Sequence, residues 1–145
     1  MSGTSVRERA LSGLLTALTR VPGARVAREI AVPTDVPLAG LLILRDGDPG
    51  EPEETFSPHT YHYEHVAQLE AIVQSGQSAS RAVSLDGLLY AIGRVLEEDR
   101  TLGDAVEWLE WSAPRTEDLA IPAGAAIKGA IVTVVLMYST ENPLC

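Results

Sequence analysis

The segment from Thr60 to Gln74 alternates between apolar and polar side chains along its whole length, and this pattern constrains the fold more than any other feature. Side chains of a β-strand point alternately to its two faces, so a period of two puts one set against a core and leaves the other in water. We therefore expect a long strand in a sheet with one buried face. The apolar set is Tyr61, Tyr63, His65, Ala67, Leu69, Ala71 and Val73, and the polar set is His62, Glu64, Gln68, Glu70 and Gln74.

Shorter patterns before and after this strand predict two helices and further strands. A Ser-x-x-Glu capping box at 5–8 precedes leucines at helical spacing, which predicts a helix over about 6–20. A second leucine stripe, after a polar turn at 75–80, predicts a helix over about 84–99. The element order indicates one α+β domain over residues 1–145, a mixed, mainly antiparallel β-sheet flanked by two main helices on one face. The further strands are expected at 25–32, 38–44, 106–111 and 127–138.

Residues 46–58 contain five acids, three prolines, two glycines and no base. This composition predicts a long acidic loop, either mobile or extended as an arm. The segment is long for a connection inside a compact domain, which indicates a role outside its own core. A calcium loop at Asp46, Asp48 and Glu51 is disfavoured, because prolines stand at 49 and 52 and the required glycine and glutamate register is missing.

Charge is distributed unevenly along the chain. The net charge is -9, but residues 1–45 carry six arginines and three acids, whereas residues 46–145 carry five bases and seventeen acids. A net excess of acids disfavours a protein that holds nucleic acid by neutralising its phosphates. The asymmetry fits a partner surface and a merely solvated surface equally well.

The cysteine content and the N-terminal residues indicate the cellular compartment. The single cysteine, Cys145, cannot form an internal disulfide, and residues 2–9 are polar and charged rather than an apolar signal region. The most apolar stretch, 120–138, is interrupted by Pro122, Gly124 and Lys128, which disfavours a membrane span. We expect a soluble protein of cytosolic origin that does not engage a membrane.

The three histidines lie within seven residues, at 59, 62 and 65. On a strand His62 points away from His59 and His65, which are themselves about 20 Å apart, so a zinc site within one chain is geometrically poor. Strand-surface histidines near a subunit contact are the preferred interpretation, and a small metal protein or enzyme built around them is the alternative. The sequence has no nucleophile elbow, phosphate-binding loop or dinucleotide fingerprint, so we expect no catalytic residue, cofactor or metal.

Four features together resemble the tail-terminator, or tail-completion, proteins of long-tailed phages and of phage-like gene-transfer particles. They are an opening amphipathic helix with arginines at 7–20, the long strand at 61–73, Thr101-Leu102-Gly103 after the second helix, and a final strand running into Tyr138-Ser139-Thr140-Glu141-Asn142-Pro143. The similarity covers nearly the full chain through short, degenerate motifs. Ser139 stands where many relatives have Arg, and Asp104 where a second Gly is common.

This resemblance implies a structural virion protein of the tail or neck, made in the host bacterial cytoplasm. Such proteins assemble as a homohexameric ring on the last tube ring, stop tail-tube polymerisation and offer the surface on which the head connector docks. The tail-tube protein would lie on one face and a head-connector or stopper protein on the other. DNA would pass through the lumen without specific binding, and an acidic lumen would repel its phosphates. A connector adaptor or a tube-like subunit is the alternative within this class.

In such a ring we expect the basic N-terminal region of one subunit to meet acidic surface of its neighbour in a head-to-tail contact. The 46–58 segment would then reach the tube or the next ring. Trp108 and Trp111 face opposite sides of a strand, so at least one is expected to be exposed or at a subunit interface, with core packing as the alternative. The residues expected at subunit or partner contacts are Arg7, Arg9, Arg20, Arg28, Asp46, Asp48, Glu51, Glu53, Glu54, Phe56, Trp108 and Trp111.

Overall fold

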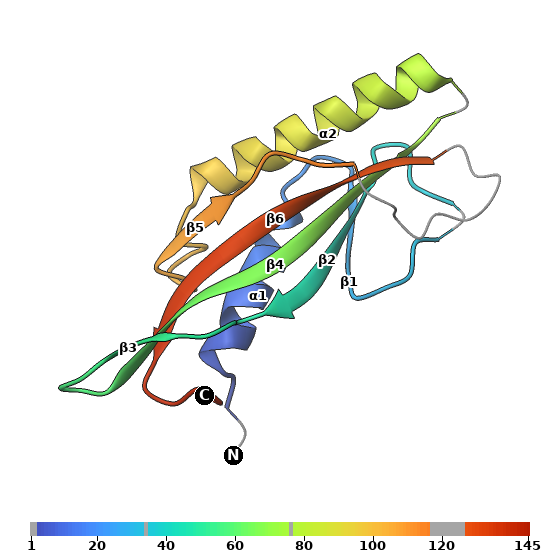
Figure 1. Cartoon of the computed structure of the whole chain (residues 1–145). Helices are drawn as coiled ribbons and strands as arrows, with labels where there is room; N and C mark the ends of the chain where they lie inside the picture. The colour runs from blue at the N-terminus through green and yellow to red at the C-terminus, as the bar shows by residue number, and fades with distance from the viewer. Residues whose placement is uncertain (1–2, 34, 76, 117–126) are drawn as a thin grey trace.

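The computed structural model describes residues 3–33, 35–75, 77–116 and 127–145. In these residues the chain forms two helices and a six-stranded sheet, in the strand order β1-β2-β4-β6-β5 with β3 paired to β4 (Figure 1). β1 runs parallel to β2 and the other pairs are antiparallel, so the expected α+β class with a mixed, mainly antiparallel sheet is confirmed. The elements are α1 (Val6–Leu18), β1 (Arg25–Arg28), β2 (Leu41–Asp48), β3 (Glu53–Thr55), β4 (Thr60–Gln74), α2 (Ser78–Glu98), β5 (Trp108–Trp111) and β6 (Ile127–Thr140).

β4 is the central strand and has the bounds that its alternation predicts. It pairs with β6 along its whole length, from Tyr61 opposite Thr140 to Gln74 opposite Ile127. Its odd-numbered side chains from Tyr63 to Val73 are buried, whereas the even-numbered ones except Ile72 are exposed or partly exposed. The sheet therefore has the one extensively buried face that the period of two requires.

Both helices pack on that buried face. Leu14 and Leu18 of α1 and Leu96 of α2 belong to one cluster with Leu69 of β4 and Leu136 of β6, and none of these side chains is accessible to solvent. Burying a leucine contributes about 1.5–3 kcal/mol, so this layer is the main source of stability. A smaller cluster lies on the opposite face, made of Leu41, Ile43 and Ile72 with Ile30, Val32, Val36 and Ile127 packed against them.

Several element boundaries differ from the sequence-based prediction. β1 ends at Arg28 rather than at residue 32, and β5 begins at Trp108 rather than at residue 106. The second helix begins at Ser78 rather than near 84, so the polar turn predicted through residue 80 is wrong there. Its first turns are largely exposed and carry no apolar stripe, and Gln77 makes no side-chain capping bond. β2 begins at Leu41 rather than at Leu38, whose side chain is 94% exposed. Because the first turns of α2 bury no apolar face, hydrophobic periodicity cannot detect where this helix begins. The apolar run at 38–44 includes residues that precede β2, so it predicts too early a start for that strand.

The acidic segment predicted at 46–58 forms an extended arm and not an irregular loop. β2 continues to Asp48, and β3 pairs with the start of β4, with Glu53 opposite His62 and Thr55 opposite Thr60. Figure 1 shows this hairpin projecting from the sheet beyond the end of β6. We call residues 48–60 the acidic arm.

A β-bulge at the base of the arm depends on Gly47. The register of β2 against β4 shifts between Arg45 and Asp48, and Gly47 has a φ of 68° in this interval. A Cβ atom at this position would lie 1.8 Å from the carbonyl oxygen of Val66. Only glycine fits this close approach, so the direction of the arm depends on this residue.

Candidate functional site

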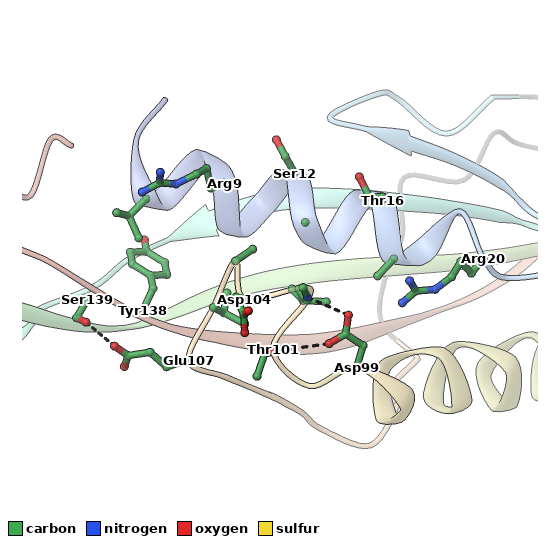
Figure 2. A pocket seen from close by; sticks show the side chains of 17 residues that line it. Arg9, Ser12, Thr16, Arg20, Asp99, Thr101, Asp104, Glu107, Tyr138 and Ser139 are labelled. Carbon is green, nitrogen blue, oxygen red and sulfur yellow. Dashed lines mark hydrogen bonds between the residues drawn. The ribbon is translucent and has the colours of Figure 1, made fainter. Parts of the chain in front are cut away.

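A groove runs along α1, between that helix and residues 99–107, which connect α2 to β5 (Figure 2). Its cavity volume is about 1030 Å³. Arg9, Ser12, Thr16 and Arg20 form the helix wall, at the three- and four-residue spacing that places side chains along one helix face. The groove thus has a polar wall with an arginine toward each end.

Gly13 sets how closely α1 approaches the connecting segment. A Cβ atom on Gly13 would lie 2.9 Å from the Cβ of Ala105 and 3.4 Å from that of Leu102. Glycine inside a helix costs about 1 kcal/mol relative to alanine. Here the missing side chain allows the close helix-to-loop contact beneath the groove.

The opposite wall carries acids, two of which are engaged locally. Asp99 accepts hydrogen bonds from the backbone amide of Gly103 at 2.9 Å and from the hydroxyl of Thr101 at 3.3 Å. Glu107 accepts a hydrogen bond from the Ser139 hydroxyl. Figure 2 shows these acids across the groove from the helix wall. These donors are uncharged, so the hydrogen bonds orient the two carboxylates without neutralising them.

Arg9 and Arg20 have no such partners. Both residues are exposed, and within the described part of the chain neither guanidinium forms an ion pair. Arg7, the third arginine expected at a subunit contact, is half-buried near Tyr138. The helix wall thus offers two available cations to a ligand in the groove.

The connecting segment contains a left-handed turn. Leu102, Gly103 and Asp104 have φ values of 51°, 65° and 69°, a region that L side chains other than Asn and Asp rarely adopt. Glycine would adopt the conformation of Asp104 without steric cost.

We expect Asp104→Gly to raise the free energy of unfolding by about 0.5–1 kcal/mol, because glycine adopts positive φ without steric cost. Urea denaturation measures the change. Asp86→Gly is the matched control, since Asp86 lies within α2 and its replacement by the poorer helix former glycine should lower stability by about 0.3 kcal/mol. A loss of stability in Asp104→Gly would contradict this interpretation of the turn.

Arg28 forms the strongest ion-pair centre of the described residues. Its guanidinium binds Glu8 through two bonds of 2.7 and 2.9 Å, and Asp46 through two more of the same lengths. The hydrogen bonds from Arg28 and then from Ser12 lower the pKa of Glu8 from 4.5 to about 2. In turn, the hydrogen bonds to Glu8 and then to Asp46 raise the pKa of Arg28 above its ordinary value. Arg28 and Asp46, both expected at partner contacts, thus bind each other within the chain.

The expected position on the strand surface is wrong for His65, which is buried and held in a hydrogen-bond network. Its Nε2 lies 2.6 Å from the carbonyl oxygen of Asp46, which can only accept, so Nε2 carries the proton. Its Nδ1 then accepts the hydroxyl of Tyr138 at 2.7 Å, and burial raises the pKa of Tyr138 to about 12. His62 lies on the opposite face of β4, as expected. Within the described residues, no three His, Cys, Asp or Glu side chains are grouped to hold a metal ion.

The arm presents acids and one aromatic ring to solvent. Phe56 is 72% exposed and stacks on His59 with a centroid distance of 4.6 Å. Glu54 binds His59 at 2.7 Å, whereas the carboxylates of Glu51 and Glu53 form no bond to another described residue. Asp48 accepts the backbone amide of Gly50 at 2.7 Å.

The two tryptophans lie on opposite faces of β5, as expected. Trp108 is 43% exposed opposite Met137, and Trp111 packs against the core cluster opposite Val134. The guanidinium of Arg100 lies 5.1 Å from the Trp108 ring and 4.3 Å from the Trp111 ring. Neither tryptophan lines the groove.

The structure therefore brings Arg9 and Arg20 together in one groove and places the acids of the arm on a projecting hairpin. The sequence analysis did not identify Ser12, Thr16 or residues 99–107 as part of a site. The sequence did contain a sign that α1 lines a site, because a stripe of polar side chains runs along one side of an otherwise apolar helix. Nothing in the sequence indicated which segment faces that stripe.

No protein-family model matches the chain, and a search of curated proteins finds no match. No helix of the described residues is long and apolar enough to cross a membrane.

Proposed function

We propose that this chain is a structural subunit of a phage-like tail, which forms a homohexameric ring that ends tail-tube polymerisation and joins the tail to the head connector. The features that carry the resemblance lie on α1, on β4, in the turn after α2, and on β6 with the residues that follow it. They thus involve the central strands and the helix that lines the groove. The fold class by itself supports many functions, so it is not the basis of the proposal.

The observation that carries the proposal is the presence of complementary, unpaired charges on two different surfaces of one chain. Glu51 and Glu53 project on the arm, and Arg9 and Arg20 line the groove. A contact between two unlike surfaces is heterologous, and repeating it produces a closed ring when the rotation between copies closes. An isologous dimer would instead have the two copies exchange the contact reciprocally, each arm in the groove of the other copy.

The overall charge suits a channel through which DNA moves without being held. The chain carries a net charge of -9, and an acidic lumen repels phosphates rather than binding them. The tail-tube protein and a head-connector or stopper protein are the partners that this role requires. The role also places the chain in the virion, at the tail or neck.

Electron microscopy of particles that carry a labelled copy of this chain tests the proposal. We expect one ring of label at the junction of tail tube and head connector, and we expect deletion of the gene to leave overlong tails and unjoined heads. Label repeated along the tube would instead identify a tube-like subunit. Label on the connector with tails of normal length after deletion would identify an adaptor. Particles without the label would contradict any structural role.

A further inference from the structure

We infer that the acidic arm of one copy binds in the groove along α1 of a second copy. The inference deepens the proposed function and rests on it, because it assigns the contact that would hold neighbouring ring subunits together. It names both surfaces: residues 48–60 on one copy, and α1 with residues 99–107 on the next. Each surface keeps charged groups that form no ion pair with another described residue: Glu51 and Glu53 on the arm, and Arg9 and Arg20 in the groove.

The arm has the character of a segment that needs a partner. Every residue from Glu53 to His59 is exposed, and the tip extends past the last paired residue of β6 as a two-stranded hairpin. Such hairpins are marginally stable in water without further packing. Phe56, the chain's only phenylalanine, exposes 72% of its surface at this tip. An exposed aromatic residue on a projecting hairpin is typical of an interface anchor.

The groove offers what this arm lacks. Its volume of about 1030 Å³ is large enough to hold the side chains of a hairpin tip, and both apolar and polar side chains line it. Val6, Ala17 and Val106 provide apolar surface for an aromatic ring, while Arg9 and Arg20 provide cations for carboxylates. The acids of the groove, Asp99, Asp104 and Glu107, lie on the far wall, so the carboxylates of the arm would bind on the side of α1, where Arg9 and Arg20 lie.

Charge complementarity therefore selects a second copy as the occupant. The arm contains acids and no Lys or Arg, and the helix wall contains arginines and no acid. A nucleic acid is a poor alternative, because the groove lining holds only two arginines and the chain as a whole carries a net charge of -9. Each copy has one arm and one groove, so each can bind two neighbours head to tail.

Charge reversal in the full-length chain tests the contact. The arm variant carries Glu51→Arg and Glu53→Arg, and the groove variant carries Arg9→Glu and Arg20→Glu. We expect the wild-type chain to self-associate in analytical ultracentrifugation, and each variant alone to associate at least about tenfold more weakly, because like charges then meet at the contact. Circular dichroism confirms that the variants are folded, since all four residues are exposed.

Mixing the two variants is the decisive measurement. The basic arm of one variant then meets the acidic groove of the other, and the acidic arm of the second meets the basic groove of the first. We expect association to return in the mixture, which shows that arm and groove belong to different copies. Arg25→Glu with Asp86→Lys is the matched control, because both residues are exposed and lie outside the arm and groove, and it should associate as wild type does.

Three results would overturn the inference: a wild-type chain that stays monomeric, variants that associate like wild type, or a mixture without rescue. The proposed function fails separately from this contact. A labelled ring at the tail junction in particles made with either charge-reversed variant would leave the function intact and remove the contact. Rescue in the mixture, together with particles that lack the chain, would support the contact and remove the function.

Discussion

Replacing Gly47 with alanine is expected to lower the free energy of unfolding by about 3 kcal/mol or more. Two costs add at this position. The φ of 68° costs a residue with a Cβ atom about 1–2 kcal/mol. The new Cβ would also lie 1.8 Å from the carbonyl oxygen of Val66, a contact that only backbone movement can relieve. Because that movement shifts β2 against β4, the arm should also lose its direction.

Gly50→Ala is the matched control for this substitution. Gly50 has nearly the same φ, 70°, but a Cβ atom there would meet nothing within 4 Å. We expect it to cost only about 1 kcal/mol, from the backbone conformation alone. Urea denaturation of both variants measures the difference. Equal losses would show that the bulge adapts to a side chain and that close approach does not explain Gly47.

Replacing Arg28 with alanine is expected to lower the free energy of unfolding by about 2 kcal/mol, the second largest effect. Arg28 connects α1, β1 and β2, because it binds Glu8 and Asp46 from its position at the end of β1. Its removal leaves two carboxylates facing each other without a cation. A fully buried pair would cost about 3–5 kcal/mol, and partial exposure of both carboxylates reduces the loss here.

Two controls test whether geometry or charge alone accounts for this loss. Arg94→Ala removes an exposed pair with Glu97 at 3.9 Å and should change stability by less than about 0.5 kcal/mol. Arg28→Lys keeps the charge but cannot bind both carboxylates through paired bonds, so it should recover only part of the loss. Full recovery by lysine would contradict the role of the planar guanidinium.

The same ion pair predicts a pH dependence with a defined sign. The pKa of Glu8 is about 2 in the folded chain and 4.5 as its ordinary value, so the unfolded state binds the proton more tightly. The contribution of Glu8 is therefore fully present above pH 4.5 and is lost as the pH falls towards 2. In urea titrations between pH 7 and 2, the difference between wild type and Glu8→Gln should shrink over this window. A constant difference would show that ionisation of Glu8 does not stabilise the fold.

The Ser-x-x-Glu capping box at 5–8 predicted one of its two hydrogen-bonding roles correctly. Ser5 caps α1 as expected, because its hydroxyl accepts the backbone amide of Glu8 at 3.0 Å. The carboxylate of Glu8 takes a different partner from the one the motif specifies, since it binds Arg28 and Ser12. A local motif predicted the helix start correctly. A residue twenty positions away in the sequence decided what the glutamate does.

The acidic segment shows the same limit for strands. Proline and glutamate are poor strand formers, so the composition of 46–58 predicts no regular structure there. β3 exists because three of its residues pair with the start of β4, which is already held by β6. Strand formation at this position thus depends on a partner strand rather than on intrinsic propensity.

The sequence by itself determined the central strand, the two helices on one face, the fold class and the split of charge between the two parts of the chain. These properties follow from periodicity and composition, which act locally and can be detected without a partner segment. Only the tertiary structure decided which charges are neutralised and which remain available. Arg28 and Asp46 meet because β1 and β2 are adjacent, whereas Arg9 and Arg20 line a groove and form no ion pair with any described residue. Such pairing depends on distances between segments far apart in the chain, which no local pattern contains.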